Sequence, residues 1–222
     1  MCAMINFDIV VQSLDVLLVG LGMTLQLTVI SLLIALVLGL ITALMKLSKK
    51  RALNAIANAY INVMRGTPLL VQVFYIYFAI PSLLGTRIDA WTAAISALSL
   101  NAGAYIAEVF RSGIQAVPRG QMEAARSLGM THRQAMRYVI LPQAFRIVIP
   151  SLLNQFIITL KDTSLVSVIG FEELARKGQL IIATTYSAFE IWTVVALFYL
   201  VVVLALTRLS EYLEKRLNVG TR

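Results

Sequence analysis

Five long apolar runs, separated by shorter polar segments, dominate the hydrophobic pattern of this sequence. A helix needs roughly 20 predominantly apolar residues to cross the hydrocarbon core of a bilayer. Transmembrane β-strands are about half as long and alternate in polarity, which these runs do not. The pattern therefore predicts an all-α integral membrane protein with a single transmembrane domain over residues 1–222. The expected spans cover residues 14–45, 66–86, 90–108, 143–168 and 190–208.

The composition supports this class of protein. Of the 222 residues, 59% are hydrophobic and 14% are charged, and the mean hydropathy is +0.83, which is too apolar for a soluble domain of this size. The beginning of the chain lacks the basic region of a signal peptide, so we expect the first helix to stay in the membrane. A single cysteine, Cys2, excludes an internal disulfide, and a single histidine, His132, argues against an all-protein zinc site. We expect no metal, no cofactor and no catalytic residue in this chain.

Lysine and arginine are concentrated in three segments, after the first run, after the third run and in the C-terminal tail. Cytoplasmic loops of membrane proteins carry an excess of these residues. Since five spans place the termini on opposite sides, the asymmetry predicts an external N-terminus and a cytoplasmic C-terminus. It also places the polar segment 111–142 in the cytoplasm. The same asymmetry accounts for the net charge of +8, so we expect no nucleic-acid partner.

The polar segment 111–142 contains clear helix start and stop signals. Pro118 suits the first turn of a helix, and Gly129 can supply the left-handed residue that ends it. Thr131 and Gln134 then form a capping box for a second helix, which Pro142 ends or bends as the chain returns to the membrane. The segment is therefore expected to be a helical hairpin rather than a solvated loop.

A helix break is expected at the start of the second span. Residues 52–64 have the pattern of an amphipathic interfacial helix. Gly66-Thr67-Pro68 then interrupts this helix, because proline lacks a backbone donor and disfavours helical geometry in the residue before it. Within a membrane such a break is tolerated where it is buried in protein or lines a wet cavity. Gly66 and Pro68 are therefore either a structural kink or part of a substrate pathway.

The fourth expected span concentrates polar residues at membrane depth. Gln155, Thr159 and Asp162 share one helical face, and Lys161 lies on the adjoining stripe. Such residues are costly in a membrane and are functional candidates by default. Asp162 could meet the ammonium group of a short zwitterion, Lys161 its carboxylate and Gln155 a side-chain amide. The alternative is that Lys161 and Asp162 pair with neighbouring helices.

Two further polar residues are candidates for the same pathway. Gln72 belongs to the second expected span, and Asn101 to the third. Either could complete the lining of a substrate path. The competing interpretation for each is a hydrogen bond between helices.

Within the polar segment, residues 123–125 (EAA), Gly129 and residues 141–142 (LP) resemble the EAA loop of permease subunits of bacterial ATP-binding-cassette (ABC) importers. Val139 stands where that family usually has isoleucine. Residues 65–72 (RGTPLLVQ) and 161–165 (KDTSL) are similar to signatures of the polar amino acid permeases within the family. The resemblance extends over almost the whole chain.

The resemblance implies a type I importer fold of five transmembrane helices in a bacterial cell membrane. It implies a dimer with a second permease subunit, identical or similar, and two ATPase subunits that bind ATP and magnesium. It also implies an extracytoplasmic solute-binding protein that delivers an amino acid substrate. This chain has no P-loop of the GxxxxGK[ST] type, so it cannot supply the energy for transport by itself.

The resemblance further implies that the first helix of the polar segment is a coupling helix seated in a groove of the ATPase. The expected coupling residues are Glu123, Ala124, Ala125, Arg126, Leu128 and Gly129. Among these, the alanines and Leu128 would leave a low-profile surface for close approach.

The substrate is less strongly indicated than the class of transporter. Relatives that carry basic amino acids are expected to have an acidic residue near the position of Gln155, so the sequence favours glutamine. Basic amino acids and cystine remain open. An ATPase-independent channel or carrier is the alternative from a different class, although we find no inverted repeat that would support a carrier. A membrane-embedded enzyme is disfavoured because the chain has neither an HExxH nor a GxSxG motif.

Overall fold

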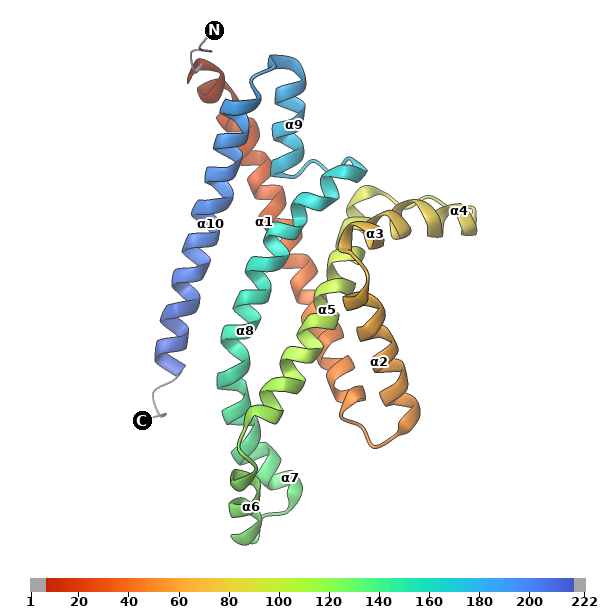
Figure 1. Ribbon diagram of the computed structural model, residues 1–222, viewed down its shortest axis with the longest axis vertical. Helices are drawn as coiled ribbons and strands as arrows, with labels where there is room; N and C mark the ends of the chain where they lie inside the picture. Colours follow the sequence, from red (N-terminus) through yellow and green to blue (C-terminus); the bar gives the residue numbers. More distant parts are fainter. Residues whose placement is uncertain (1–6, 218–222) are drawn as a thin grey trace.

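The computed structural model describes residues 7–217, and these form helices joined by short connections (Figure 1). The α-helices are α1 (Phe7–Lys46), α2 (Arg51–Gly66), α3 (Leu69–Phe74), α4 (Ile80–Leu84), α5 (Ala90–Ala116), α6 (Arg119–Ser127), α7 (His132–Ala135), α8 (Leu141–Asp162), α9 (Leu174–Thr185) and α10 (Ala188–Leu217). The π-helical segments are η1 (Tyr75–Ala79) and η2 (Met136–Ile140), and the 3-10 segment is η3 (Thr163–Ile169). Four of the helices described are long and apolar enough to cross a membrane, and a bent pair raises the number to five. The expected all-α membrane architecture is confirmed.

Helix α5 lies at the centre of the bundle and packs against α1, α2 and α8. Its side chains at Ala93, Ala97, Ala104 and Ala107 are fully buried. Small residues allow transmembrane helices to approach closely, and van der Waals packing then holds them together. At Gly103 an added Cβ atom would lie 2.9 Å from the hydroxyl oxygen of Tyr60, so this position has no room for a larger residue.

The second expected span, residues 66–86, corresponds to α3, η1 and α4, and a sharp bend separates it from α2. Helix α2 packs against α1 and α5, and the chain then turns through 106° before it continues as α3, η1 and α4. Thr67 and Pro68, between the two helices, have extended backbone geometry. Figure 1 shows α3 and α4 projecting sideways from the bundle, while α2 runs beside α5. The bend opens the bundle at the level of Gly66 and Pro68.

The segment after the hairpin corner is a continuous, gently irregular helix from His132 to Ile169. Pro142 was expected to end or bend this helix, and the helix does not end there. The π-helical turn η2 lies just before Pro142, and the amide of Leu141 donates to the carbonyl of Met136. A π-bulge shifts the backbone pairing locally, so the missing amide of proline is accommodated and the helix continues from the hairpin into α8.

Helix α9 and the beginning of α10 lie at the end of the molecule opposite the hairpin, and α10 then runs along the side of the bundle (Figure 1). Glu173 caps α9 and is fully buried. Its carboxylate accepts the backbone amides of Ala175 and Arg176 at 3.0 and 2.8 Å and the hydroxyl of Tyr199 at 2.8 Å. The hydroxyl of Thr24 in α1 accepts the amide of Leu174 at 3.1 Å. These bonds tie α9 to both α1 and α10.

Candidate functional site

A polar cavity of about 540 Å³ lies where the α2–α3 bend faces α5 and α8. The bend brings backbone close to the centre of the bundle, and α5 and α8 supply side chains from the opposite walls. The cavity is lined by Arg65, Gly66, Thr67, Pro68, Leu69, Asn101, Tyr105, Gln155, Ile158 and Asp162. Three segments that are far apart in the sequence therefore meet at one cavity.

The cavity contains one cationic and one anionic side chain. The Arg65 guanidinium lies over the ring of Tyr105, 5.1 Å from its centre. Asp162 is half-buried. Within residues 7–217, neither Arg65 nor Asp162 forms an ion pair. Both charges are therefore available to a ligand that carries charges of both signs.

The polar residues expected along the fourth span take different positions. Gln155 and Asp162 line the cavity. Thr159 lies behind Gln155, whose amide nitrogen is 3.4 Å from its hydroxyl oxygen. Lys161 is exposed and does not line the cavity. The cation at the site is instead Arg65, which the sequence signals only by its place directly before the helix break.

Asn101 lines the cavity, whereas Gln72 lies one layer behind it. The Gln72 amide nitrogen donates to the carbonyl of Met64 at 2.8 Å and lies 3.1 Å from the carbonyl and 2.8 Å from the hydroxyl oxygen of Thr67. The Asn101 amide nitrogen donates to the Gln72 side-chain oxygen at 3.1 Å. Gln72 thus bonds the backbone of the bend and the amide of Asn101 at once.

The helical hairpin of α6, α7 and η2 lies at one end of the bundle (Figure 1). Helix α6 ends in a Schellman motif, because Gly129 adopts a φ of +83° and the amide of Met130 donates to the carbonyl of Ala125 at 3.2 Å. Thr131 and Gln134 form the expected capping box. The helix, corner and helix predicted from the sequence are confirmed.

A small apolar core joins the hairpin to the membrane helices. Its buried members are Val117, Ile140 and Ala144, with Met122 and Met136 packed against them. The residues come from the end of α5, the hairpin and the start of α8. This core therefore connects α6 to α5 and α8 through buried contacts.

The surface of α6 differs in one respect from the expected low-profile face. Leu128 is 84% exposed, and Glu123, Ala124 and Arg126 are also exposed. Ala125, however, is buried and faces the inside of the hairpin. Its side chain packs the hairpin and is not available to a partner.

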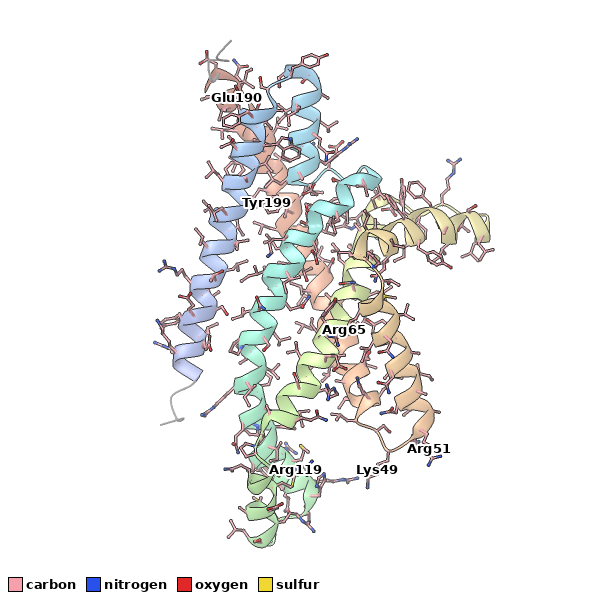
Figure 2. All side chains as sticks on the ribbon, viewed as in Figure 1. Lys49, Arg51, Arg65, Arg119, Glu190 and Tyr199 are labelled. Carbon is pink, nitrogen blue, oxygen red and sulfur yellow. The ribbon has the colours of Figure 1, made fainter. Side chains whose placement is uncertain are left out.

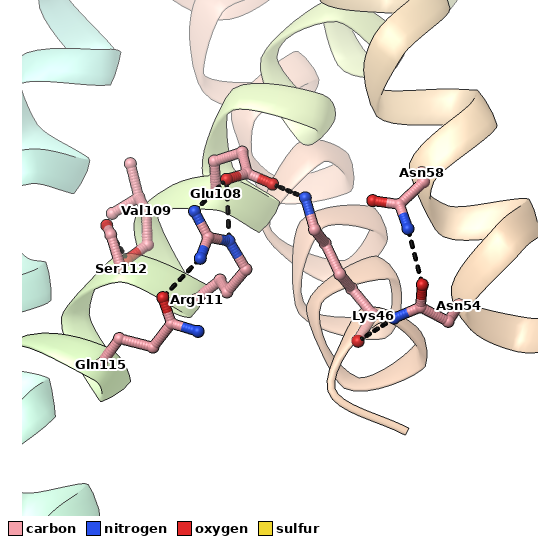
Figure 3. Close-up of polar contacts among 8 residues, drawn as sticks. All are labelled: Lys46, Asn54, Asn58, Glu108, Val109, Arg111, Ser112 and Gln115. Atoms are coloured by element: carbon pink, nitrogen blue, oxygen red, sulfur yellow. Dashed lines mark hydrogen bonds and ion pairs between the residues drawn. The ribbon is translucent and has the colours of Figure 1, made fainter. Parts of the chain in front are cut away.

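A second polar cluster lies at the hairpin-directed end of α5, beside the start of α2 (Figure 3). Glu108 is ion-paired with Lys46 and with Arg111, whose Nη2 lies 2.7 Å from the carboxylate. The Asn54 amide nitrogen donates to the carbonyl of Lys46 at 2.5 Å, and Asn54 accepts from Asn58 at 2.6 Å. This network, the Glu108 cluster, fastens the ends of α1 and α2 to α5.

Among the residues that the structure describes, no group of three or more histidine, cysteine, aspartate or glutamate side chains could hold a metal ion. The polar cavity offers one carboxylate, one guanidinium and two amides. This set can bind a small zwitterion through ion pairs and hydrogen bonds.

Comparison with known proteins gives a family. Residues 35–219 match the family described as binding-protein-dependent transport system inner membrane component. The chain belongs to this family, whose members are the permease components of ABC transporters. It is thus a multi-pass inner-membrane protein and part of a complex in which separate ATPase subunits bind ATP.

The chain is 47% identical over 167 residues to a glutamine transport system permease protein of Escherichia coli K12, covering 75% of this chain and 76% of that one. It is 39% identical over 214 residues to an arginine transport system permease protein of Bacillus subtilis 168, covering 96% and 98%. A crystal structure described as an amino acid ABC transporter with histidines superposes with a TM-score of 0.93 at 46% identity, over 96% of this chain and 100% of that one. A methionine ABC transporter, with a TM-score of 0.77 at 22% identity, shares the fold. The expected importer-permease fold is confirmed.

Proposed function

We propose that this chain lines the translocation pathway of an ATP-driven importer for polar amino acids, and that glutamine is its substrate. One observation carries the proposal: the cavity holds two amides together with a carboxylate and a guanidinium that form no ion pair within residues 7–217, and these groups come from three different helices. An amino acid presents an ammonium and a carboxylate to such a site. Relatives named for glutamine and for arginine transport support an amino acid as the cargo.

Each polar group of the cavity has a role in this proposal. Asp162 accepts the α-ammonium group, and Arg65 binds the α-carboxylate in place of Lys161, which lies outside the cavity. Gln155 and Asn101 bond the side-chain amide of glutamine. Gln155 is neutral, so it offers a basic side chain no ion pair, and this favours glutamine over arginine.

The pathway itself is proposed to form between two permease subunits, identical or similar. Five helices are few to enclose a polar path, and the bend opens the cavity to the side of the bundle. A solute-binding protein would deliver substrate to the end of the molecule that carries α9.

The orientation that we propose places the hairpin and the C-terminus in the cytoplasm. Figure 2 shows Lys49, Arg51 and Arg119 toward the hairpin end of the molecule and Glu190 at the opposite end. This distribution agrees with the excess of cations on cytoplasmic loops. A reporter enzyme fused after the C-terminus would be active only if it is cytoplasmic, and an externally active reporter would reverse the assignment.

The transport proposal is tested with the permease, its ATPase and its solute-binding protein reconstituted in proteoliposomes. We expect ATP-dependent uptake of labelled glutamine that exceeds uptake of arginine and cystine. Preferential arginine uptake would overturn the choice of substrate. Uptake at the same rate without the ATPase would favour a channel or carrier.

The coupling surface has its own test. Leu128 at the C-cap of α6 and Leu83 in α4 are each 84% exposed, so they form a matched pair at different places in the fold. We propose that Leu128 inserts into the ATPase, and we expect Leu128→Ser to lower ATPase co-purification at least tenfold, as for an interface hot spot. Leu83→Ser should leave it unchanged. Equal ATPase recovery with both variants would remove Leu128 from the interface.

A further inference from the structure

The α2–α3 bend leaves backbone carbonyls that have lost their helical partners. An α-helix ends with carbonyl groups that no intrahelical amide can reach, and at this bend those of Met64 and Thr67 lie beside the buried side chain of Gln72. An unsatisfied buried carbonyl costs free energy comparable to a lost hydrogen bond. The Gln72 amide nitrogen lies 2.8 Å from the Met64 carbonyl, 3.1 Å from the Thr67 carbonyl and 2.8 Å from the Thr67 hydroxyl, so its two hydrogens are shared among these three acceptors.

These carbonyls fix which way the Gln72 amide points. A carbonyl oxygen only accepts, so the nitrogen of Gln72 must face the bend and its oxygen must face away. That oxygen lies 3.1 Å from the amide nitrogen of Asn101. Gln72 is buried, with 8% of its surface exposed, so water cannot freely replace these partners.

The orientation of Asn101 follows in the same way. Its nitrogen faces the Gln72 oxygen and lies 3.4 Å from the carbonyl of Met64. Its own oxygen accepts no hydrogen bond from residues 7–217, and Asn101 lines the polar cavity. The free acceptor of Asn101 is therefore held in one orientation at the cavity by a residue that does not itself line it.

We propose that Gln72 is a positioning residue. Its side-chain amide bonds to the backbone of the α2–α3 bend and holds the Asn101 oxygen as an acceptor for an N–H group of the substrate. The inference rests on the proposed function, since it assumes that the cavity binds an amino acid. The proposal links the α2–α3 bend to the cavity. A change in the bend angle moves the Gln72 amide and breaks its hydrogen bond with Asn101. Substrate affinity is thereby coupled to the shape of the broken helix.

The test measures binding of labelled glutamine, and of labelled arginine in parallel, to the permease–ATPase complex in nanodiscs. Gln72→Met has nearly the same shape and removes both functions of the amide. We expect about tenfold weaker binding, the effect of one hydrogen bond of ordinary strength. Binding within twofold of wild type would overturn the inference.

A double-mutant cycle shows whether Gln72 acts through Asn101. We expect Asn101→Ala to weaken binding about tenfold, and the Gln72→Met/Asn101→Ala double variant to bind no more weakly than Asn101→Ala alone, because the effects of coupled residues do not add. Losses that multiply to about a hundredfold would show that Gln72 acts independently, and they would overturn the proposed link.

Gln72→Glu serves as the second variant should Gln72→Met fail to assemble. A carboxylate can still accept from Asn101 but has no hydrogen to donate to the carbonyls of the bend, so we expect about tenfold weaker binding, as for Gln72→Met. Binding within twofold of wild type in an assembled complex would overturn the inference. Tyr60→Phe is the matched control, because it deletes a bond between α2 and α5, from the Tyr60 hydroxyl to the Leu100 carbonyl at 2.6 Å, and leaves the Gln72–Asn101 bond between α3 and α5 in place.

The same measurement separates the inference from the proposed function. If the wild-type complex binds neither amino acid, the proposed function fails, and the inference fails with it. If wild type binds one of them and the Gln72 variants do not differ from it, only the inference fails.

Discussion

The polar cavity and the Glu108 cluster lie about two turns apart along α5, and they differ in whether their charged side chains are paired. At the cavity, Arg65 and Asp162 are brought together with Asn101 but form no ion pair within residues 7–217. At the Glu108 cluster, the carboxylate is shared by Lys46 and Arg111. Helix α5 therefore contributes to two sites: the cavity, whose charged side chains form no ion pair within residues 7–217, and the Glu108 cluster, whose charges are paired.

This difference in ion pairing suits the cavity to binding a ligand and the Glu108 cluster to holding helices together. Charged groups at membrane depth are costly unless something pairs with them, so unpaired charges in the cavity lower stability until a ligand binds. The Glu108 cluster is already paired and ties α1 and α2 to α5. We therefore expect substitutions at the cavity to change transport, and substitutions at the Glu108 cluster to change stability.

The largest expected effect is at Asp162. Asp162→Asn keeps the shape but removes the charge that meets the substrate ammonium. A hydrogen bond to a charged group contributes about 1.5–3 kcal/mol, so uptake should fall by roughly tenfold to a hundredfold. Uptake in proteoliposomes measures this, while the thermal midpoint should not fall.

Lys161→Gln is the matched control for that substitution. Lys161 is the neighbouring residue but is exposed and lies outside the cavity. Uptake within twofold of wild type is expected. A loss as large as that of Asp162→Asn would return the carboxylate-binding role to Lys161 and weaken the comparison.

Glu108→Gln tests the paired cluster. It leaves the half-buried Lys46 and Arg111 without their shared anion, which should destabilise the complex by about 2 kcal/mol; a fully buried pair would cost more. The thermal midpoint in detergent should fall by several degrees, while uptake at low temperature stays within about threefold. A variant with unchanged stability and abolished uptake would place Glu108 among the functional residues and break the comparison.

Gly129→Ala tests the corner of the hairpin. An added Cβ atom at Gly129 has nothing within 4 Å, but the φ of +83° disfavours every residue with a side chain. The cost should be about 1–2 kcal/mol. ATP hydrolysis stimulated by substrate should fall, because the corner positions α6.

Gly120 in α6 supplies the control for this substitution. An added Cβ atom there is also free of contacts, and its φ is not positive. Gly120→Ala should therefore leave stability unchanged or raise it by about 0.5–1 kcal/mol. Equal losses at the two glycines would show that the surface of the hairpin, and not its backbone geometry, is sensitive.

The smallest expected effect concerns pH and Glu173 at the opposite end. Burial raises the pKa of the Glu173 carboxyl, and hydrogen bonds from Ala175, Tyr199, Arg176 and Thr24 offset this only in part. The folded state thus binds the proton more tightly than the unfolded state, whose pKa is about 4.3. The contribution of this group to stability is full below that pKa and is lost as the pH rises through the folded pKa.

Glu173→Gln removes this dependence. We expect the thermal midpoint of wild type, relative to Glu173→Gln, to be higher at pH 5 than at pH 8. The difference is measured by thermal unfolding of the two proteins in parallel at both values. If the thermal midpoint of wild type relative to Glu173→Gln rises with pH, this would contradict the raised pKa of the Glu173 carboxyl.

Much of the local structure could be predicted because it depends on neighbours in the chain. The signals at Gly129, Thr131 and Gln134 involve contacts within a few residues, and the hairpin forms as they indicate. The passage through Pro142 could not be predicted, because a π-helical turn before it depends on how the hairpin packs on α5 and α8.

The candidate site was only partly accessible to sequence reasoning. Gln155 and Asp162 follow from helical spacing, since residues seven apart share a face. Arg65 begins the RGTPLLVQ signature, but it had no assigned role at the site until the fold placed it at the cavity, over the ring of Tyr105. Gln72 could be assigned to the pathway or to a helix contact, and only its distances to the bend and to Asn101 assign it a bonding role.

By itself the sequence determined that this protein is a bundle of membrane helices with a capped hairpin and a break near Pro68, because hydrophobic length, charge distribution and caps act locally. The tertiary structure alone decided that the break faces α5 and α8, that Ala125 turns inward, and which polar residues share the cavity. Those outcomes depend on the packing of helices that are far apart in the chain, and no local pattern encodes the direction of a 106° bend.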